Sequence, residues 1–431
     1  MAAFNISPTR HYDDGRNIYW QLGGSLAMGN ENNHVVVNQA KELIGLCRAG
    51  RLYGIEKWIA EGKSLDISEA IRRGRQRSLL EIAVETGFHS LVELIAKHET
   101  SQSAKDAALG DAVSLRRLDL VELLLANGAD IKAVRFADVL LTWEPKLIRL
   151  FIDHGADPLE GRPFAEAFGA RVRTALRPFL DYKQTHPELA SQLQEQVDCA
   201  LRHFCGEGDI KWVSLLMWAG GDPRSRGPCL QKEYTEDPDC YTSGLEEASR
   251  SENLDVLKKL KPDANRDNLS ELLDCATLWE RKETLEYLLQ IGANPNDKPN
   301  GASSALDTAL RHLGFARLDY GSKRLKSKYD IWRALDCVRE LLTHGATWNS
   351  NDAYNVNSLR RTLLECEPDV TIELLQMFRK HNACPAERVH RLLGTPRMKE
   401  HLKAKTDALL RLGIHLDTRP NASLHRQPSR A

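Results

Sequence analysis

Apolar residues recur along the chain in a helical pattern that ends each time in a Gly-containing turn. The segment LVELLLANGAD, residues 120–130, is one example, and related segments begin at residues 147, 212, 284 and 337. Leu120, Val121 and Leu124 have the spacing of one face of an α-helix. Gly128 then fits a helix end, because Gly adopts the left-handed conformation at no steric cost. The pattern predicts a repeated unit of helix and turn.

A second, shorter helix is predicted before each of these segments. The clearest complete unit is SLLEIAVETGFHSLVELIAKHE, residues 78–99. Its first helix contains Leu80, Ile82 and Ala83, Gly87 interrupts the pattern, and a second helix begins near Ser90. A pair of helices this short cannot bury its own apolar face, whereas stacked pairs can. We therefore expect an all-α solenoid of stacked helix–turn–helix units.

The order of residues in these units resembles that of the ankyrin-repeat family. Ser78, Leu80 and Ala83 match the start of an ankyrin repeat, Gly87 matches its central break, and residues 128–130 (Gly-Ala-Asp) match its end. The resemblance runs from about residue 43 to about residue 417 and implies about nine or ten units. The repeats are degenerate: Leu79 stands where the family has Pro, and Glu81 where it has His. These departures predict irregular loops.

The repeats suggest three regions: a flexible N-terminal arm or cap (1–34), an ankyrin-like solenoid (35–417) and a C-terminal tail (418–431). The arm is either disordered or a strap that engages a partner through Tyr12, Tyr19 and Trp20. Long insertions are expected near residues 162–196, 222–244 and 313–335. Because insertions into repeats tend to gather on one face, often the binding face, these are candidates for partner specificity.

Composition restricts the partner and the compartment. The chain has 59 Lys and Arg against 60 Asp and Glu, a balance that argues against nucleic acid as the main partner. The sequence contains neither a secretory signal nor an apolar run long enough to cross a membrane. Its nine cysteines are scattered and odd in number, which is typical of reduced thiols. We expect an intracellular, cytoplasmic protein.

Two clusters of basic residues lie in predicted loops. One contains Arg72, Arg73, Arg75 and Arg77, and the other Lys323, Arg324, Lys326 and Lys328. Either cluster could meet phosphate or an acidic protein surface. The alternative is a solvated loop with dispersed charge, which the overall neutrality favours.

The sequence offers little support for metal binding or catalysis. Cys199, His203, Cys229 and Cys240, near Cys205, are a conceivable zinc set, but their spacing lacks the close Cys pairs of structural zinc sites. Buried packing is the competing interpretation of these cysteines. Because the sequence has no phosphate-binding loop, metalloprotease motif or nucleophile elbow, we expect no enzymatic activity and no cofactor.

The resemblance implies a non-enzymatic scaffold or adaptor that binds another protein through its concave face and long loops. The alternative is a regulator or inhibitor of an enzyme or nucleic-acid system, with Arg72, Arg73, Arg75 and Arg77 touching nucleic acid. Large aromatic and basic residues in turns and loops are the candidate contacts. They are Trp143, Trp218, Tyr234, Tyr241, Trp279, Tyr320, Lys323, Arg324, Lys326 and Trp348. For the tryptophans, packing between degenerate repeats is the other explanation.

Overall fold

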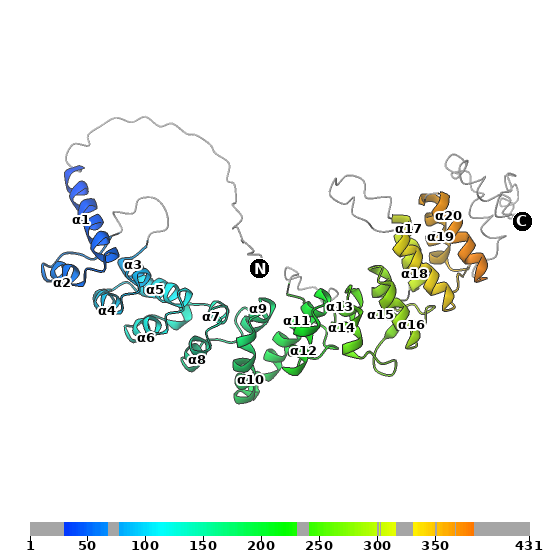
Figure 1. Cartoon of the computed structure of the whole chain (residues 1–431), viewed down its shortest axis with the longest axis horizontal. Coiled ribbons are helices and arrows are strands. Elements are labelled where there is room, and N and C mark those ends of the chain that lie inside the picture. The colour runs from blue at the N-terminus through cyan, green and yellow to red at the C-terminus, as the bar shows by residue number, and fades with distance from the viewer. Residues whose placement is uncertain are drawn as a thin grey trace, which may run out of the picture. The chain divides into compact units, whose positions relative to one another are not determined.

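A computed structural model describes residues 30–67, 77–230, 241–299, 301, 303–315, 331–349, 351–366 and 368–382. In this part of the chain the regular structure is helical, apart from one isolated antiparallel bridge between Gly227 and Thr242. The helices form antiparallel pairs (Figure 1). By their contacts the residues divide into unit 1, Met1–Val134, and unit 2, Arg135–Ala431. We call the first helix of each pair inner and the second outer.

Unit 1 stacks its helix pairs in chain order. The inner helices α1, α3 and α5 pack against one another in sequence, and the outer helices α2, α4 and α6 do the same. Their bounds are α1 Asn30–Arg48, α2 Leu52–Ala60, α3 Leu79–Thr86, α4 His89–His98, α5 Gln102–Ser114 and α6 Leu118–Ala126. A short 3-10 helix, η2 (Ile131–Ala133), follows α6. This arrangement is the predicted all-α stack of ankyrin-like units.

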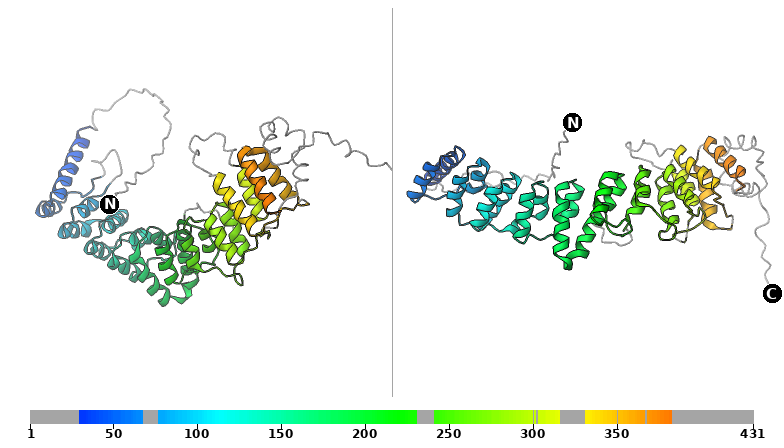
Figure 2. Two further views of the ribbon diagram at one scale, coloured as in Figure 1. Left: turned by 45° about the vertical axis from the view of Figure 1, so that its right-hand side comes forward. Right: turned by 60° about the horizontal axis from the view of Figure 1, so that its bottom comes forward.

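Unit 2 continues the same pairing, and two further views show it from other directions (Figure 2). The inner helices pack in chain order and are α7 Phe136–Leu140, α9 Pro163–Gly169, α11 Ala190–Glu207, α13 Gly244–Arg250, α15 Leu269–Leu278, α17 Ala305–Phe315 and α19 Ala353–Glu365. The outer helices are α8 Pro145–Asp153, α10 Leu176–Thr185, α12 Ile210–Trp218, α14 Leu254–Leu260, α16 Lys282–Gln290, α18 Ile331–Thr343 and α20 Pro368–Lys380. The 3-10 helices η3 (Arg173–Ala175) and η4 (Pro187–Leu189) flank α10.

The pair α3–α4 shows why these residues form these elements. Ser78 caps α3 by accepting a hydrogen bond from the Glu81 backbone N–H, and the Glu81 carboxylate accepts one from the Ser78 N–H. This reciprocal cap satisfies two backbone donors that the first turn leaves without partners. Gly87 ends the helix with φ 73°, and Leu80 and Ala83 are fully buried. The Glu81 that replaces the family His is therefore the capping residue of this repeat.

A pair of polar side chains on α5 explains the recurring Gly-Ala-Asp turn in unit 1. Gln102 Nε2 donates to the Gly128 carbonyl oxygen at 3.0 Å, and Asp106 Oδ1 accepts from the Asp130 backbone N–H at 2.8 Å. Gln102 and Asp106 also bond to each other. We call this arrangement the Gln–Asp clamp. It satisfies backbone groups that the end of α6 would otherwise leave open.

The same clamp recurs in unit 2. Gln194 Nε2 donates to the Gly220 carbonyl oxygen at 2.8 Å, and Asp198 Oδ1 accepts from the Asp222 backbone N–H at 2.7 Å. Further along, Asn296 performs both tasks for the turn after α18, donating to Gly345 O and accepting from the backbone N–H of Thr347. In these repeats, side chains on the inner-helix side thus bind the turn that follows an outer helix.

Aromatic rings fill the core where α7, α9 and α10 meet. Phe164 makes edge contacts with Phe136 and Phe179, at ring-centroid distances of 5.7 Å and 5.2 Å. Phe168 completes the cluster, and Phe164, Phe168 and Phe179 are fully buried. Residues 162–196, which look like an insertion in the sequence, thereby contribute core to the stack. Among the described residues, no helix is both long and apolar enough to cross a membrane.

Candidate protein-binding surface

Three of the predicted tryptophans lie at the surface of unit 2. Trp143 is 45% exposed in the turn between α7 and α8, and Trp279 is 49% exposed in the turn between α15 and α16. Trp218 is the last residue of α12 and is 67% exposed. Large, half-exposed indole rings of this kind are common anchors at protein interfaces.

Trp143 has a left-handed backbone conformation, as do Arg116, Arg171 and Glu280 in the equivalent turns of other repeats. Its φ is +63°, in the left-handed region where a side chain costs about 1–2 kcal/mol. The equivalent turn between α11 and α12 uses Gly208, with φ +75°, which incurs no such cost. The conformation therefore belongs to the turn of the repeat, and the exposed ring is what distinguishes Trp143.

Trp348 has a different environment. It is only 6% exposed, and its Nε1–H donates to the Asn355 carbonyl oxygen at 2.8 Å. Both ends of the side chain are thus occupied inside unit 2, so the packing explanation applies to this residue. This corrects the expectation that Trp348 offers a surface to a partner.

Several predicted contact residues lie outside the described residues. They are Tyr234, Tyr320, Lys323, Arg324 and Lys326, together with Arg72, Arg73 and Arg75. Arg77, at the edge of that last group, is described and forms ion pairs with Glu85 at 2.5 Å and with Asp111 at 3.2 Å. Its guanidinium therefore serves the contact between neighbouring repeats of unit 1.

The described residues between α12 and α13, 222–230 and 241–243, are held by a buried arginine of α11. Arg202 is completely buried, and its guanidinium donates to the carbonyl oxygens of Ser225 (3.1 Å) and Pro228 (3.2 Å). A third bond goes to Glu195 at 2.5 Å. An arginine suits this task because its rigid fork donates in several directions at once. We call residues 222–230 and 241–243 the loop base.

The loop base packs so closely against Arg202 that it requires a glycine at the point of contact. Gly227 pairs with Thr242 through two backbone hydrogen bonds, and a Cβ added to it would lie 2.5 Å from Arg202 Nη2. On α9, a Cβ at Gly169 would lie 2.8 Å from Leu230 Cδ1. The loop base therefore rests directly on the inner helices α9 and α11.

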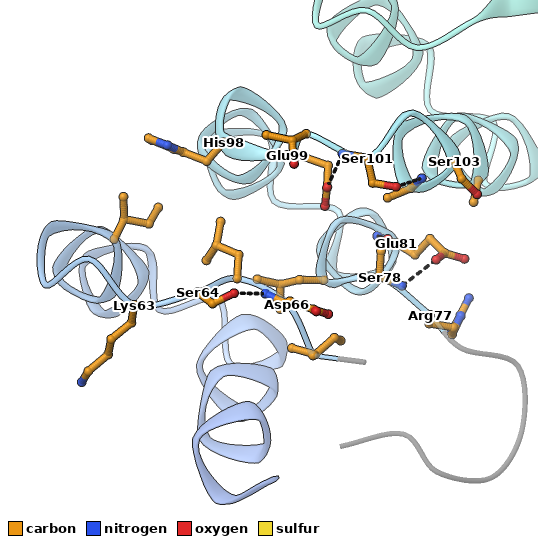
Figure 3. Close-up of a pocket in the computed structure, with 17 residues that line it drawn as sticks. Lys63, Ser64, Asp66, Arg77, Ser78, Glu81, His98, Glu99, Ser101 and Ser103 are labelled. Carbon is orange, nitrogen blue, oxygen red and sulfur yellow. Dashed lines mark hydrogen bonds between the residues drawn. The ribbon is translucent and has the colours of Figure 1, made fainter. Parts of the chain in front are cut away.

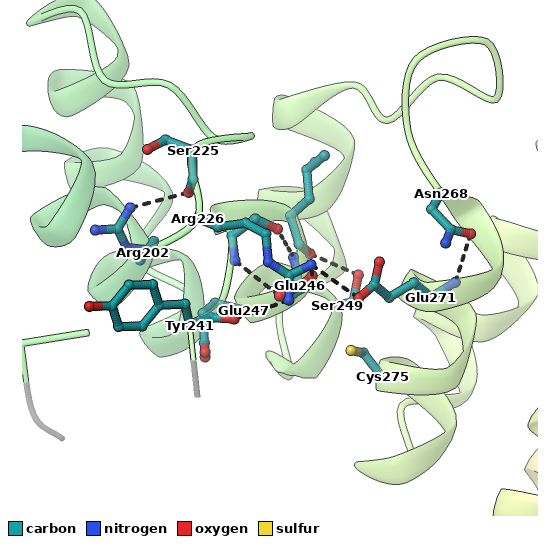
Figure 4. A network of polar contacts seen from close by, with 12 residues as sticks. Arg202, Ser225, Arg226, Tyr241, Glu246, Glu247, Ser249, Asn268, Glu271 and Cys275 are labelled. Carbon is teal, nitrogen blue, oxygen red and sulfur yellow. Dashed lines mark hydrogen bonds and ion pairs between the residues drawn. The ribbon is translucent and has the colours of Figure 1, made fainter. Parts of the chain in front are cut away.

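Two further arginines tie the loop base to the following inner helices. Arg224 makes a two-pronged contact with Asp267, at 2.8 Å to each carboxylate oxygen, and this hydrogen bonding raises the pKa of Arg224. Arg226 bridges Glu246 of α13 and Glu271 of α15, at 2.8 Å and 3.1 Å (Figure 4). Burial raises the pKa of Glu246 despite this ion pair.

Tyr241, another predicted contact residue, lies in the second segment of the loop base, just before α13. It is half-buried, and its carbonyl oxygen accepts a hydrogen bond from Arg226 Nη2 at 3.1 Å. Its backbone position is therefore determined by the same arginine that ties the loop base to α13 and α15. Tyr241 was predicted as a contact from the sequence, whereas Arg202, Arg224 and Arg226 were not. An Arg on the apolar side of α11 was the available signal, and it points to burial only once the loop is placed over it.

The cysteines of the zinc hypothesis lie beside this loop base. Cys199 and Cys205 are buried, Cys229 is half-buried, and Cys240 falls outside the described residues. Burial raises the pKa of both Cys199 and Cys205, which keeps them as thiols. His203 pairs with Glu207 at 3.5 Å. Within the described part of the chain, no group of three or more His, Cys, Asp or Glu residues could hold a metal ion.

Unit 1 has a polar cavity of about 850 Å³ (Figure 3). Its walls include Arg77, the capping residues Ser78 and Glu81, and Ser101, which caps α5. The hydrogen bonds of Ser78 and Ser101 complete helix caps. Because Ile67 and Arg77 border residues outside the described part, we assign no ligand to this cavity.

Comparisons with known proteins give matches among solved structures alone. Neither a family model nor a curated protein sequence matches the chain. Solved structures do match. The human ASB11 ankyrin repeat domain is 16% identical with a TM-score of 0.29, covering 62% of this chain and 96% of that one. The ankyrin repeat domain of Bcl-3, described as a unique member of the IkappaB protein family, is 18% identical with a TM-score of 0.21, covering 80% and 99%. At these TM-scores, the fold assignment depends on the helix pairing within each unit.

Proposed function

We propose that this ankyrin-repeat chain is a non-enzymatic scaffold or adaptor in the cytoplasm that binds another protein through the inner-helix side of unit 2. The observation that carries the proposal is the buried Arg202 under the loop base. A charged side chain is completely buried to hold two carbonyl groups of a surface loop. Burying a charge is costly unless its hydrogen bonds are made, so the arrangement specifies one loop conformation.

A preformed loop base favours protein binding for an energetic reason. Ordering side chains and loops at an interface costs about 0.5–1.5 kcal/mol for each mobile side chain. Because Arg202, Arg224 and Arg226 already order the loop base in the folded chain, this cost does not arise on binding. A partner would find the backbone around Tyr241 already in place.

Trp218 adds an exposed aromatic ring beside the loop base. Trp218 lies at the end of α12, from which the chain enters the loop base. A large ring beside a preformed loop is the combination from which interface hot spots are built. We assign Trp218 and Tyr241 as the contacts with the partner.

Site-specific photo-crosslinking in the intact chain tests this proposal. A photoreactive phenylalanine derivative would replace Tyr241 in one variant and Trp218 in another. A matched control would carry it at Glu283, an exposed position on α16. After irradiation in cells, both site variants should form a covalent adduct with the same protein, and the Glu283 variant should not.

The proposal fails if the adducts appear equally at Glu283, or if neither site variant captures a protein. Circular dichroism would first establish that each variant is folded. Substitution of Arg202 by Met should then reduce the yield of the Tyr241 adduct, because the loop base loses its support. An unchanged yield would show that the preformed loop base is not the feature that the partner recognises.

A further inference from the structure

Four exposed cations on the outer side of unit 2 have no partner among the described residues. Lys146 and Arg149 belong to α8, Arg173 to η3 and Arg177 to α10, and all four are exposed. Some other exposed cations of this unit are paired, for example Arg171 with Glu207, whereas Lys259 and Arg266 on other repeats are exposed in the same way. In the described structure, the side chains of these four make neither an ion pair nor a hydrogen bond. We call them the basic patch.

The basic patch is one surface because its elements pack together. Helix α8 contacts both η3 and α10. Trp143 lies in the turn that leads into α8, so its exposed ring lies at the N-terminal edge of the patch. The patch therefore combines four exposed cations with a half-exposed aromatic ring whose backbone is strained.

The fold does not require basic residues at these positions. Most of the described turns between an inner and an outer helix contain a residue with positive φ, and equivalent outer-helix positions can be counted from it. Arg149 and Arg177 occupy the same position in neighbouring repeats. In four other repeats this position holds Glu56, Glu93, Glu122 and Glu286. Since the repeats fold with glutamate at this position, helix packing does not explain the two adjacent arginines. Their charge points to a contact with another molecule.

Lys146 is also a cation at a position where helix stability does not favour positive charge. It is in the first turn of α8, where the positive end of the helix dipole disfavours a cation. The equivalent position holds Asp255 in α14 and Glu283 in α16, and a lysine, Lys211, in α12. A cation that helix stability disfavours is consistent with selection for a ligand.

Nearby carboxylates narrow the choice of ligand. Glu144 lies beside Lys146, and Asp153 and Asp181 are exposed toward the C-terminal ends of α8 and α10. They would repel a long polyanion such as nucleic acid, and the chain as a whole has a net charge of −1. Separate carboxylates on a short peptide can sit between these anions, and an apolar side chain of that peptide can cover Trp143.

We infer that the basic patch binds an acidic segment of a protein partner, with Trp143 as its apolar anchor. This site lies on the outer helices, whereas the proposed loop-base surface lies on the inner helices. The inference goes beyond the proposed function and does not depend on it. Loss of crosslinking at Tyr241 would leave the patch experiment unaffected.

The test measures binding of a defined peptide to the intact chain by fluorescence polarisation. The probe is a short fluorescein-labelled peptide of glutamate and aspartate residues around a central leucine. Arg149→Glu/Arg177→Glu should weaken binding by about tenfold or more, since two attractions become repulsions. The control Lys259→Glu/Arg266→Glu changes the net charge equally at exposed positions of unit 2 and should bind like the unmodified chain.

Two further measurements separate this role from a structural one. The Arg149→Glu/Arg177→Glu variant should unfold at the same temperature as the unmodified chain, because neither arginine has an ion pair to lose within the described structure. Trp143→Gly should weaken peptide binding by about threefold, the range expected for one aromatic contact. Added salt should weaken binding to the unmodified chain and have little effect on the double variant.

Three outcomes would overturn the inference. The first is equal peptide binding by the patch variant and its control. The second is patch-dependent binding of single-stranded DNA or of phosphatidylserine vesicles that exceeds binding of the peptide. The third is patch-dependent self-association in sedimentation, which would make a second copy of the chain the occupant.

Discussion

Two turns of the molecule begin alike and end differently. After α6, Gly128 and Asp130 are held by the Gln–Asp clamp of Gln102 and Asp106, and the chain enters η2 directly. After α12, Gly220 and Asp222 are held by the same clamp, formed by Gln194 and Asp198, yet the chain enters the loop base. The clamp is part of the repeat. The path of the chain beyond the second clamp depends on Arg202, which the repeat pattern does not include.

The comparison shows how a repeat protein acquires an individual surface. The turn needs only local partners on its own inner helix. The loop base depends on the buried Arg202 of α11, and on three of its own residues: Gly227, which contacts Arg202, and the ion-paired Arg224 and Arg226. Function is therefore expected where residues outside the repeat pattern support the backbone.

The largest expected effect is the loss of Arg202. Arg202→Met keeps most of the side-chain volume but removes the bonds to Ser225 O, Pro228 O and Glu195. Three lost contacts to a charged donor should destabilise unit 2 by roughly 3 kcal/mol. Chemical denaturation measures this loss. Arg149→Met, at an exposed position without a partner in the described structure, is the matched control and should change stability by less than about 0.5 kcal/mol.

A second substitution tests the packing beneath the loop base. Gly227→Ala would place a methyl group 2.5 Å from Arg202 Nη2, so the guanidinium or the loop must move. The expected cost is about 1–3 kcal/mol, typical of overpacking. Gly110→Ala, in α5, meets nothing within 4 Å and should instead stabilise by about 0.5–1 kcal/mol. Equal effects of the two alanines would contradict the packing described for the loop base.

A third pair of variants compares the two clamps directly. Asp198 is 2% exposed, whereas Asp106 is half-buried. Asp198→Ala leaves the Asp222 N–H without its partner in a drier site, so it should cost about 2 kcal/mol, against about 1 kcal/mol for Asp106→Ala. Thermal denaturation of the two single variants gives the difference. A larger loss at Asp106 would mean that burial does not set the strength of the clamp.

The smallest effect concerns the turns between inner and outer helices. Glu280 has φ +56° where the equivalent residue between α11 and α12 is Gly208. Glu280→Gly relieves left-handed strain and should stabilise unit 2 by less than about 1 kcal/mol. The gain is partly offset by a more flexible unfolded chain and by loss of the contact between the Glu280 carboxylate and His312 at 3.8 Å. A small rise in melting temperature is the expected result. Gly208→Ala is the reverse change and should lower the melting temperature.

The fold could be predicted from the sequence because each repeat has local signals for its helices and turns. The helical spacing around Leu120 and Leu124, the break at Gly87 and the Gly-Ala-Asp end at Gly128 are local signals that repetition reinforces. The exposure of individual tryptophans could not be predicted from such local signals. Trp143 and Trp348 both follow helix ends in the sequence, yet Trp143 is 45% exposed and Trp348 is 6% exposed. The difference arises from a tertiary contact, because Asn355 accepts the Trp348 indole hydrogen bond.

The sequence by itself determined the ankyrin-like architecture, because amphipathic spacing and glycine turns act over a few residues. Only the tertiary structure decided which residues support the candidate surfaces. Arg202 is buried because a loop lies across α11, and the basic patch exists because α8 and α10 are neighbours. Both facts depend on segments far apart in the chain meeting in space, and repetition in the sequence does not encode them.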